Sequence, residues 1–524
     1  MKDDMIIINA DIVTMNPALP RASALAVSNG NIRHVGDRKS IEAFKNRDIP
    51  ILDLNGKTLL PGFIDAHLHF RALAESFLTI DLKADSGIRS ICDIQNRLRL
   101  ALETASSGEW IRGAGYHETD IKEQRHPNRR DLDAVTVQHP IKITHRSGYA
   151  HVLNTPALKD VGIGRQTPDP DGGIIERDPN TGEPTGVLFN MGHDLNRKIP
   201  HVKESSLLKG IASADRNLLS HGVTTFQDAS YRNDRTRLDW LHGLKKKGLL
   251  APGVVFIQGF LSFQNDLNAL VPNAYEQDGI FSGGVKIIID ETTGIPLPEQ
   301  ADLNEMVALI HRSGRQAVIH AIEADAVRAA VTAIENAVHR HPEKRCRHRI
   351  EHCSLCPPEL AGRIGALGIT VVTHPSFIYV NGDRYLISVL PDHQPFLYPI
   401  GSLLKAGARV CAASDAPMVS PDPISGIYSA VTRMTETGNP LLPNEAVTVY
   451  NALEMHTSAA AAAGYLETSK GMIRAGKDAD FTILSADPFH VPPEEIRNIR
   501  VLMTIIGGKI MWQDSNWGSY HLHL

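Results

Sequence analysis

Strand-like and helix-like segments alternate along most of this 524-residue chain, and that alternation limits its fold more than any other feature. The segment 324–340 shows the helical part most clearly, because its apolar residues, Val327, Val331, Ile334 and Val338, recur at helical spacing. Eight segments are candidate strands: 63–67, 222–228, 253–259, 285–289, 316–320, 348–352, 369–374 and 409–415. Eight strands with helices between them predict an α/β fold, a (β/α)8 barrel of the TIM type.

The two ends of the chain predict a separate β domain. Residues 5–60 form a series of short strand patterns, and the Asn-Gly pairs at 29–30 and 55–56 are typical of hairpin turns. Residues 476–512 show the same pattern of strands and turns. Because neither end has enough strands to close a core alone, we expect one β-sandwich with parts at 1–60 and 465–524.

The connection between the first and second predicted strands is much longer than a crossover helix needs. It contains its own helix pattern at 88–105 and a Gly/Pro/Asp-rich hairpin region at 168–186. We therefore expect a barrel formed by residues 61–70 and 211–464. Residues 71–210 would form an inserted subdomain over the C-terminal face of the barrel.

Composition argues against several classes of function. A net charge of -5 is not the basic balance typical of nucleic-acid binding. No apolar run reaches the length of a membrane span, and no signal-peptide pattern precedes the first strand. Five Cys at irregular spacing argue against a disulfide framework. We expect a cytoplasmic protein that acts on a small molecule, without nucleic-acid or membrane partners and with a homodimer as one option for its assembly.

The first predicted barrel strand ends in two histidines, His67 and His69. Side chains alternate along a strand, so both imidazoles point to the same face and could hold one metal ion. Chance alone supplies about one His-x-His in a chain with 24 His, so the spacing does not decide between a metal site and a hydrogen-bonded pair. Further candidate ligands elsewhere in the chain are needed to decide between these two interpretations.

Four later barrel strands also carry candidate ligands at or near their ends: Lys286, His320, His352 and Asp415. The C-terminal ends of barrel strands meet at one face, so these side chains should lie close to the histidine pair. Nitrogen and oxygen ligands of this kind suit one or two divalent ions with open positions for water and substrate. As an alternative to metal binding, His320 or His352 could be hydrogen-bonded locally, and Asp415 could form an Asx-turn.

Lys286 interrupts the apolar run 285–289, where a lone ammonium is costly unless it is paired or neutralised. One solution is an ion pair with Asp290, four residues further along the chain. The other is reaction of the amine with CO2 to give a carbamate, which removes the positive charge. The resulting carboxylate could bridge two metal ions.

This ordered set of residues resembles that of the amidohydrolase superfamily. Finer motifs resemble its YtcJ-like branch, the amidohydrolase 3 family, which includes N-substituted formamide deformylase; they lie at 61–69, 131–135, 145–150, 182–188, 347–352 and 414–417. The resemblance implies that His67, His69 and Asp415 bind the more buried metal ion. It also implies that carbamylated Lys286 bridges to a second ion, which is held by the two remaining histidines, His320 and His352.

The resemblance further implies a Zn2+ enzyme, with other divalent metals left open, that hydrolyses the C–N bond of a small N-acyl or N-substituted amide. Asp415 would be the general acid and base for a metal-activated water. We expect substrate contacts from His145, Arg146 and Tyr149 of the insertion, and from His374, which stands where the branch has Gln. Deamination of a heterocycle, opening of a cyclic amide and a non-catalytic binding role stay open.

Aromatic residues give a weak preference for an apolar substrate. Several fall near predicted strand ends or in loops of the insertion: Phe70, Trp110, Tyr116, Tyr149, Phe377 and Tyr379.

Overall fold

The computed structural model describes residues 4–44, 49–84, 86–103, 105–170, 172–200, 202–267, 273–291 and 295–517. The chain forms two compact units. We call Met1–Leu73 together with Ala214–Leu524 the barrel unit, and Ala74–Ser213 the inserted unit. The end of the predicted C-terminal sandwich part, 518–524, lies outside the described residues.

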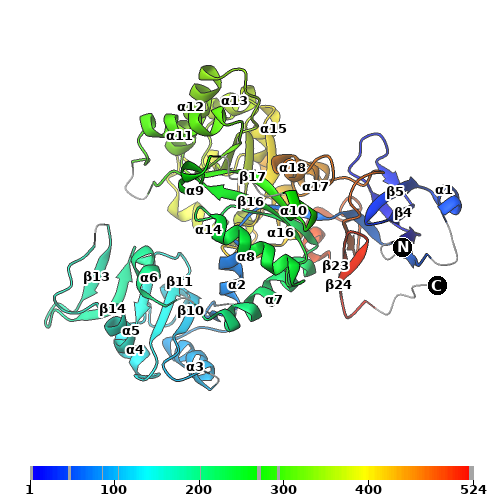
Figure 1. Cartoon of the computed structure of the whole chain (residues 1–524). Coiled ribbons are helices and arrows are strands. Elements are labelled where there is room, and N and C mark those ends of the chain that lie inside the picture. Colours follow the sequence, from blue (N-terminus) through cyan, green and yellow to red (C-terminus); the bar gives the residue numbers. More distant parts are fainter. Residues whose placement is uncertain are drawn as a thin grey trace. The chain divides into compact units, whose positions relative to one another are not determined.

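The core of the barrel unit is a parallel sheet of eight strands in the order β21-β20-β19-β18-β17-β16-β15-β8 (Figure 1). The strands are β8 (Phe63–Leu68), β15 (Val223–Asp228), β16 (Gly253–Gly259), β17 (Ile280–Ile288), β18 (Ala317–Ala321), β19 (Arg349–His352), β20 (Thr370–Thr373) and β21 (Arg409–Ala412). All eight predicted strands are therefore confirmed, as a nearly closed parallel barrel. Two bounds differ by more than one residue: β17 begins at Ile280, ahead of the predicted strand, and β21 ends at Ala412, so Asp415 lies in the following loop.

Hydrogen bonds draw the last strand toward the first at the C-terminal end. Asp415 N donates to His67 O over 2.9 Å, and His69 N donates to Ala416 O over 2.9 Å. Asp65 on β8 reinforces this seam, because its carboxylate accepts from Ser414 N over 3.2 Å and from Ser414 Oγ over 2.5 Å. The seam holds Asp415 beside the two histidines that end the first strand.

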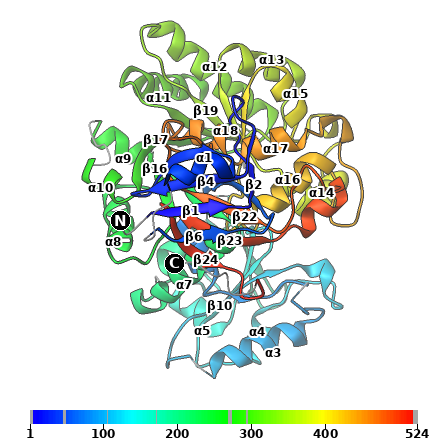
Figure 2. The ribbon, with the colours of Figure 1, turned by 90° about the vertical axis from the view of Figure 1, so that its right-hand side faces the viewer.

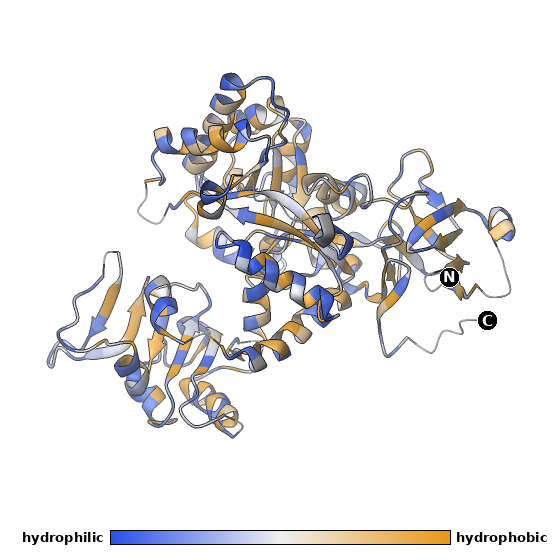
Figure 3. Ribbon diagram, viewed as in Figure 1, coloured by the Kyte–Doolittle hydropathy of each residue, from blue (hydrophilic) through white to orange (hydrophobic). Residues whose placement is uncertain are grey.

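Helices surround the barrel strands: α8 (Arg235–Lys246), α11 (Gln300–Arg312), α12 (Ala324–Arg340), α13 (Pro358–Ala366), α15 (Ile400–Lys405), α16 (Pro423–Thr432), α17 (Val449–Met455) and α18 (Ser458–Ala463). The bounds of α12 are those of the predicted helix, and its apolar face joins one buried cluster with Ile287, Ile319 and Ile350 of the strands. Figure 3 shows the apolar colouring of the central strands beside the mixed colouring of these helices. Burial of such aliphatic side chains stabilises the barrel by about 1.5–3 kcal/mol each.

Two further sheets contain strands from the ends of the chain, and only the six-stranded one combines strands from both ends (Figure 2). The four-stranded sheet contains β5 (Asn31–Gly36), β4 (Ala24–Ser28), β1 (Met5–Ile8) and β6 (Ile51–Asp53). The six-stranded sheet contains β24 (Lys509–Gln513), β23 (Val501–Ile506), β22 (Phe481–Leu484), β7 (Thr58–Pro61), β2 (Asp11–Val13) and β3 (Arg21–Ala22). Side chains from both sheets, such as Ile7 and Phe481, share one hydrophobic cluster. The two ends thus build one sheet together, while the sandwich itself stays a prediction.

The inserted unit has its own six-stranded sheet, in the order β13 (Ile174–Arg177), β14 (Pro184–Phe189), β12 (Ala150–Leu153), β11 (Ile141–His145), β10 (Ile111–Tyr116) and β9 (Ile80–Asp81). The predicted helix at 88–105 is α3 (Ile91–Leu102), which starts later because the Ser90 side chain accepts from Asp93 N and caps it. Antiparallel β13 and β14 confirm the predicted hairpin. None of the helices in the described part of the chain is both long and apolar enough to cross a membrane.

Candidate metal centre

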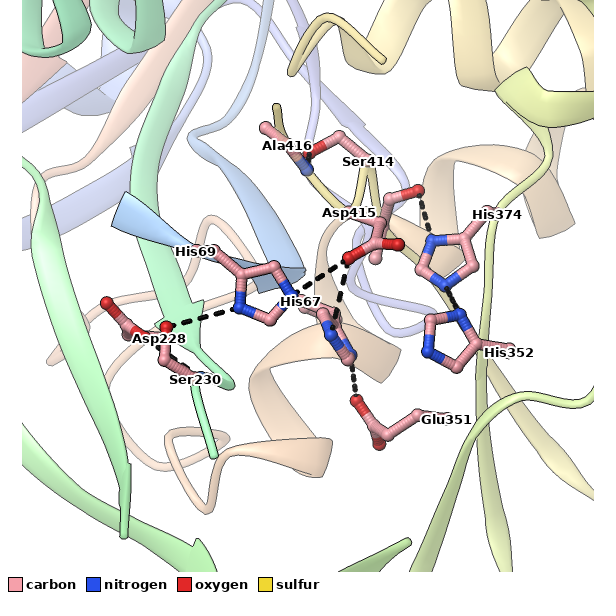
Figure 4. A network of polar contacts seen from close by, with 12 residues as sticks. His67, His69, Asp228, Ser230, Glu351, His352, His374, Ser414, Asp415 and Ala416 are labelled. Atoms are coloured by element: carbon pink, nitrogen blue, oxygen red, sulfur yellow. Dashed lines mark hydrogen bonds and ion pairs between the residues drawn. The ribbon is translucent and has the colours of Figure 1, made fainter. Parts of the chain in front are cut away.

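Side chains from the ends of the barrel strands converge around Asp415 (Figure 4). Asp415 Oδ1 lies 3.6 Å from His67 Nε2 and 3.1 Å from His69 Nε2. The ring centroid of His352 lies 5.2 Å from that of His67 and 4.3 Å from that of His320. The structure therefore brings these five predicted ligands into one group of nitrogen and oxygen atoms.

Lys286, the sixth predicted ligand, lies on β17 and is only 3% exposed. Among the described residues, no ion pair joins it to Asp290 or to another acid. Burial lowers the pKa of the Lys286 amine to about 8, although Glu351 and Asp415 act in the opposite direction. Burial lowers the pKa of His320 to about 3, and the positive charge of Lys286 is the second largest cause of this shift. The Lys286 amine therefore lies close enough to His320 to act on its charge.

His67 is held from behind by a buried ion pair that the sequence analysis did not single out. Its Nδ1 contacts Glu351 Oε2, and Arg349 binds the same carboxylate through Nε over 2.6 Å and Nη2 over 2.8 Å. The Arg349 guanidinium also donates to Gln227 Oε1 over 2.5 Å and to Ala66 O over 2.9 Å. Opposite charges two residues apart in a predicted strand were the available signal, because such residues share a face.

Two buried ring nitrogens in this group, Nε2 of His67 and Nε2 of His352, have no hydrogen-bond partner among the described residues. Burial lowers the pKa of His67 to about 3 and that of His352 well below its usual value, so both rings are neutral. A neutral imidazole nitrogen with an unused lone pair is a metal ligand, and leaving it unpartnered in the interior costs about 1–3 kcal/mol. The residues present therefore fit a divalent metal ion.

The backbone is unusual at two of these positions. His352 has a φ of 69° and Asp415 a φ of 55°, which is the left-handed region in which non-glycine residues are uncommon. Such conformations cluster at functional sites, where the surrounding structure holds them in place. Here Asp415 is held by the bond from its amide to His67 O.

The predicted substrate contacts fall in two places. His145, Arg146 and Tyr149 lie at the end of β11 and in the turn that follows it, in the inserted unit, where His145 is buried and the other two are exposed. They stay predicted contacts. His374 follows β20 in the barrel unit, is fully buried, and has both ring nitrogens hydrogen-bonded inside the protein.

A nearly closed parallel barrel with histidines and an aspartate gathered at its strand ends is the arrangement of a barrel enzyme with a candidate metal site. The chain belongs to the amidohydrolase family, whose sequence pattern matches residues 51–512. It is 29% identical to the putative amidohydrolase YtcJ of Bacillus subtilis (strain 168), over 96% of this chain and 98% of that protein. These findings confirm the resemblance to the YtcJ-like branch and make the chain a hydrolase.

Two other relatives extend the comparison. The N-substituted formamide deformylase of Arthrobacter pascens is 29% identical, over 97% of this chain and 98% of that protein. The crystal structure of an uncharacterized metal-dependent hydrolase from Pyrococcus horikoshii OT3 is similar in fold, with a TM-score of 0.76 over 94% of this chain and 99% of that chain, at 23% identity.

Proposed function

We propose that this protein is a metal-dependent hydrolase that cleaves the C–N bond of a small N-acyl or N-substituted amide. The observation that carries the proposal is the convergence on Asp415 Oδ1, which lies 3.1 Å from His69 Nε2 and 3.6 Å from His67 Nε2. Cleavage of an amide-type bond is supported by the deformylase relative, which aligns over nearly the whole of both chains.

In this proposal His67, His69 and Asp415 would hold one Zn2+ ion, and His320 and His352 would hold a second. Nitrogen and carboxylate ligands of this kind suit Zn2+. The Lys286 ammonium would first release one proton, and the free amine nitrogen would then bond to the carbon of CO2 and release a second proton, which gives a carboxylate that could serve as a further metal ligand. The resulting carbamate is an anion, so the reaction replaces a buried cation that has no acidic ion-pair partner among the described residues.

Asp415 is the group that moves the proton. Burial acts to raise the pKa of Asp415, but the hydrogen bond from His69 and the neighbouring histidines hold it below its usual range. Its carboxylate can therefore accept a proton at neutral pH. A bound metal ion supplies an activated water and polarises the substrate carbonyl.

The proton balance then follows. The water oxygen bonds to the carbonyl carbon, Asp415 takes the proton from the water, and the same proton passes to the leaving nitrogen as the C–N bond breaks. The products are a carboxylic acid and an amine.

Exposed apolar side chains just beyond the strand ends support an apolar substituent on the substrate. Tyr231 follows β15, Leu261 follows β16 and Met418 lies just after Asp415, and they are 47%, 74% and 58% exposed. Of the aromatic residues that the sequence suggested for this role, Phe70 and Tyr116 are instead buried in hydrophobic packing, whereas Tyr149 is exposed. A small-molecule substrate without a macromolecular partner, and assembly as a homodimer, stay predictions.

A substrate panel tests the proposal. The purified protein, analysed for bound metal, would be given N-alkyl formamides, N-acyl amines with apolar groups, cyclic amides and aminated heterocycles. We expect amine release from the acyclic amides, loss of this activity after chelation, and recovery with Zn2+. Turnover of only the heterocycles or cyclic amides would replace the proposal by those activities, and a protein without metal or turnover would favour the binding role.

A further inference from the structure

His374 lies beside His352 and is joined to it in a chain of hydrogen bonds (Figure 4). Its Nε2 is 2.8 Å from His352 Nδ1, and its Nδ1 is 3.2 Å from Ala413 O. Its ring stacks on Phe377, with centroids 5.0 Å apart and planes at 28°. His374 therefore has a single fixed orientation between a backbone carbonyl and another histidine.

The direction of these hydrogen bonds follows from the carbonyl. A carbonyl oxygen only accepts, so the His374 proton is on Nδ1. A neutral imidazole has one N–H, so His374 Nε2 is an acceptor and His352 Nδ1 is the donor. The lone pair of His352 is thereby left on Nε2, which is the buried nitrogen without a hydrogen-bond partner among the described residues.

The same directions argue against two other roles for His374. A metal ligand needs an unused lone pair, but the His374 Nε2 lone pair accepts from His352. A substrate contact needs a free donor or acceptor, but its Nδ1 proton goes to Ala413 O. The ring therefore acts on substrate or metal only through its neighbour.

We propose that His374 is a positioning residue, which accepts the His352 Nδ1 proton and so fixes the Nε2 lone pair of His352 toward the metal centre. The inference rests on the metal-dependent function proposed above. Hydrogen-bond partners of this kind orient a ligating histidine and raise its basicity, and their removal typically lowers metal affinity about 10–100-fold.

The barrel unit contains a matched control for this geometry. His311 Nε2 lies 3.0 Å from His341 O, and His311 Nδ1 lies 2.8 Å from His348 Nε2. His348 Nδ1 in turn accepts from Ala317 N over 2.9 Å, so every ring nitrogen of this relay has a partner. The control relay has the same carbonyl–histidine–histidine order, but it leaves no lone pair for a metal ion.

The test compares His374→Leu, His374→Gln and His311→Leu in the full chain. The Gln amide oxygen can accept the His352 proton and its NH2 group can donate to Ala413 O, whereas Leu can do neither. We expect His374→Leu to bind Zn2+ about 10–100-fold more weakly in competition with a chromophoric chelator. His374→Gln and His311→Leu should bind Zn2+ like the wild type, and His311→Leu reports the stability loss caused by removing a buried histidine acceptor.

A second measurement is the absorption spectrum of each protein loaded with Co2+, which reports the ligand set independently of turnover. Equal Zn2+ affinity and equal Co2+ spectra for His374→Leu and the wild type would overturn this inference and leave the proposed function unaffected. Equal losses in His374→Gln and His374→Leu would also overturn it, and would make His374 a ligand. A wild-type protein that binds no metal would overturn both this inference and the proposed function.

Discussion

The buried ion pair behind His67 gives the sharpest prediction about stability. Arg349 and Glu351 are both 0% exposed, and two hydrogen bonds of 2.6 and 2.8 Å join them. Burial acts to raise the pKa of Glu351, but Arg349 and His67 overcome it and hold the pKa well below its usual range. The change Glu351→Gln removes this anion and leaves a buried guanidinium without a counter-charge on β19.

The size of the effect follows from what remains around the guanidinium. Gln227 Oε1 and Ala66 O still accept from Arg349, but both are neutral. Removing one partner of a buried pair costs about 3–5 kcal/mol, and a Gln that keeps one acceptor oxygen should lie near the lower value, at about 3 kcal/mol. In Arg349→Met/Glu351→Gln neither charge is present, so the double variant should be more stable than the sum of the single changes predicts, by roughly 2 kcal/mol.

Urea unfolding of the metal-free protein at pH 8, followed by circular dichroism, measures all four corners of this double-mutant cycle. The transition must be assigned to the barrel unit, since two compact units need not unfold together. Asp239→Asn is the control, because Asp239 pairs with Arg235 at 2.9 Å on an exposed helix face and its loss should change the free energy of unfolding little. Additive single and double changes, or single changes below about 1 kcal/mol, would refute the reasoning.

Three further predictions concern the centre and the interior. Asp415→Asn should keep most bound Zn2+ but lose turnover, and full activity would contradict the proton-transfer role. Lys286→Met should lower the Zn2+ bound per chain and abolish a 13C carbamate signal that the wild type shows after 13CO2 labelling. Burial lowers the pKa of His456 to about 3, so this ring stays neutral when folded but takes up a proton below about pH 6.5 when unfolded, and its own contribution to the fall of stability with falling pH is about 1.4 kcal/mol per unit in that window. Other buried histidines, such as His67 and His320, add to the total slope, so His456→Phe should reduce the slope of denaturation midpoints between pH 7 and pH 5 by the His456 contribution, and an unchanged slope would contradict the assignment.

Most of the barrel could be predicted because its signals are local. The bounds of α12 and β16 are those predicted, since a helical apolar stripe and a run of β-branched residues each act within one segment. The end of β21 was wrong for a non-local reason. Beyond Ala412, the backbone hydrogen-bonds to Asp65 and His67, which lie far away in the sequence. No pattern within 409–415 indicates these partners.

The candidate site, like the barrel, could be predicted in part. Residue type and strand order were enough to bring His67, His69 and Asp415 together. Strand alternation, however, predicts that His352 points to the same face as Ile350, which packs against the helices. The backbone of His352 departs from the strand pattern, with a left-handed φ of 69°. The role of Glu351 could not be read either, because a contact with His67 joins strands that lie far apart in the sequence.

The direction of hydrogen bonds separates the metal centre from histidine groups that look similar by distance. His117, Glu118 and His145 also have ligand atoms within 4.8 Å of one another. There, however, His145 Nδ1 accepts from Ser147 N over 3.1 Å, so the proton of this ring lies on Nε2, which is 3.0 Å from Glu118 Oε2 but makes no hydrogen bond to it. A protonated Nε2 leaves His145 no lone pair for a metal ion.

At the strand ends the order is reversed. Glu351 accepts from Nδ1 of His67, and His374 accepts from Nδ1 of His352, so each Nε2 lone pair is left without a hydrogen-bond partner among the described residues. Both acceptors are buried and held in turn, one by Arg349 and the other by its bond to Ala413 O. In the proposed centre, metal binding therefore depends on the two acceptors that hold the histidines as much as on the histidines themselves.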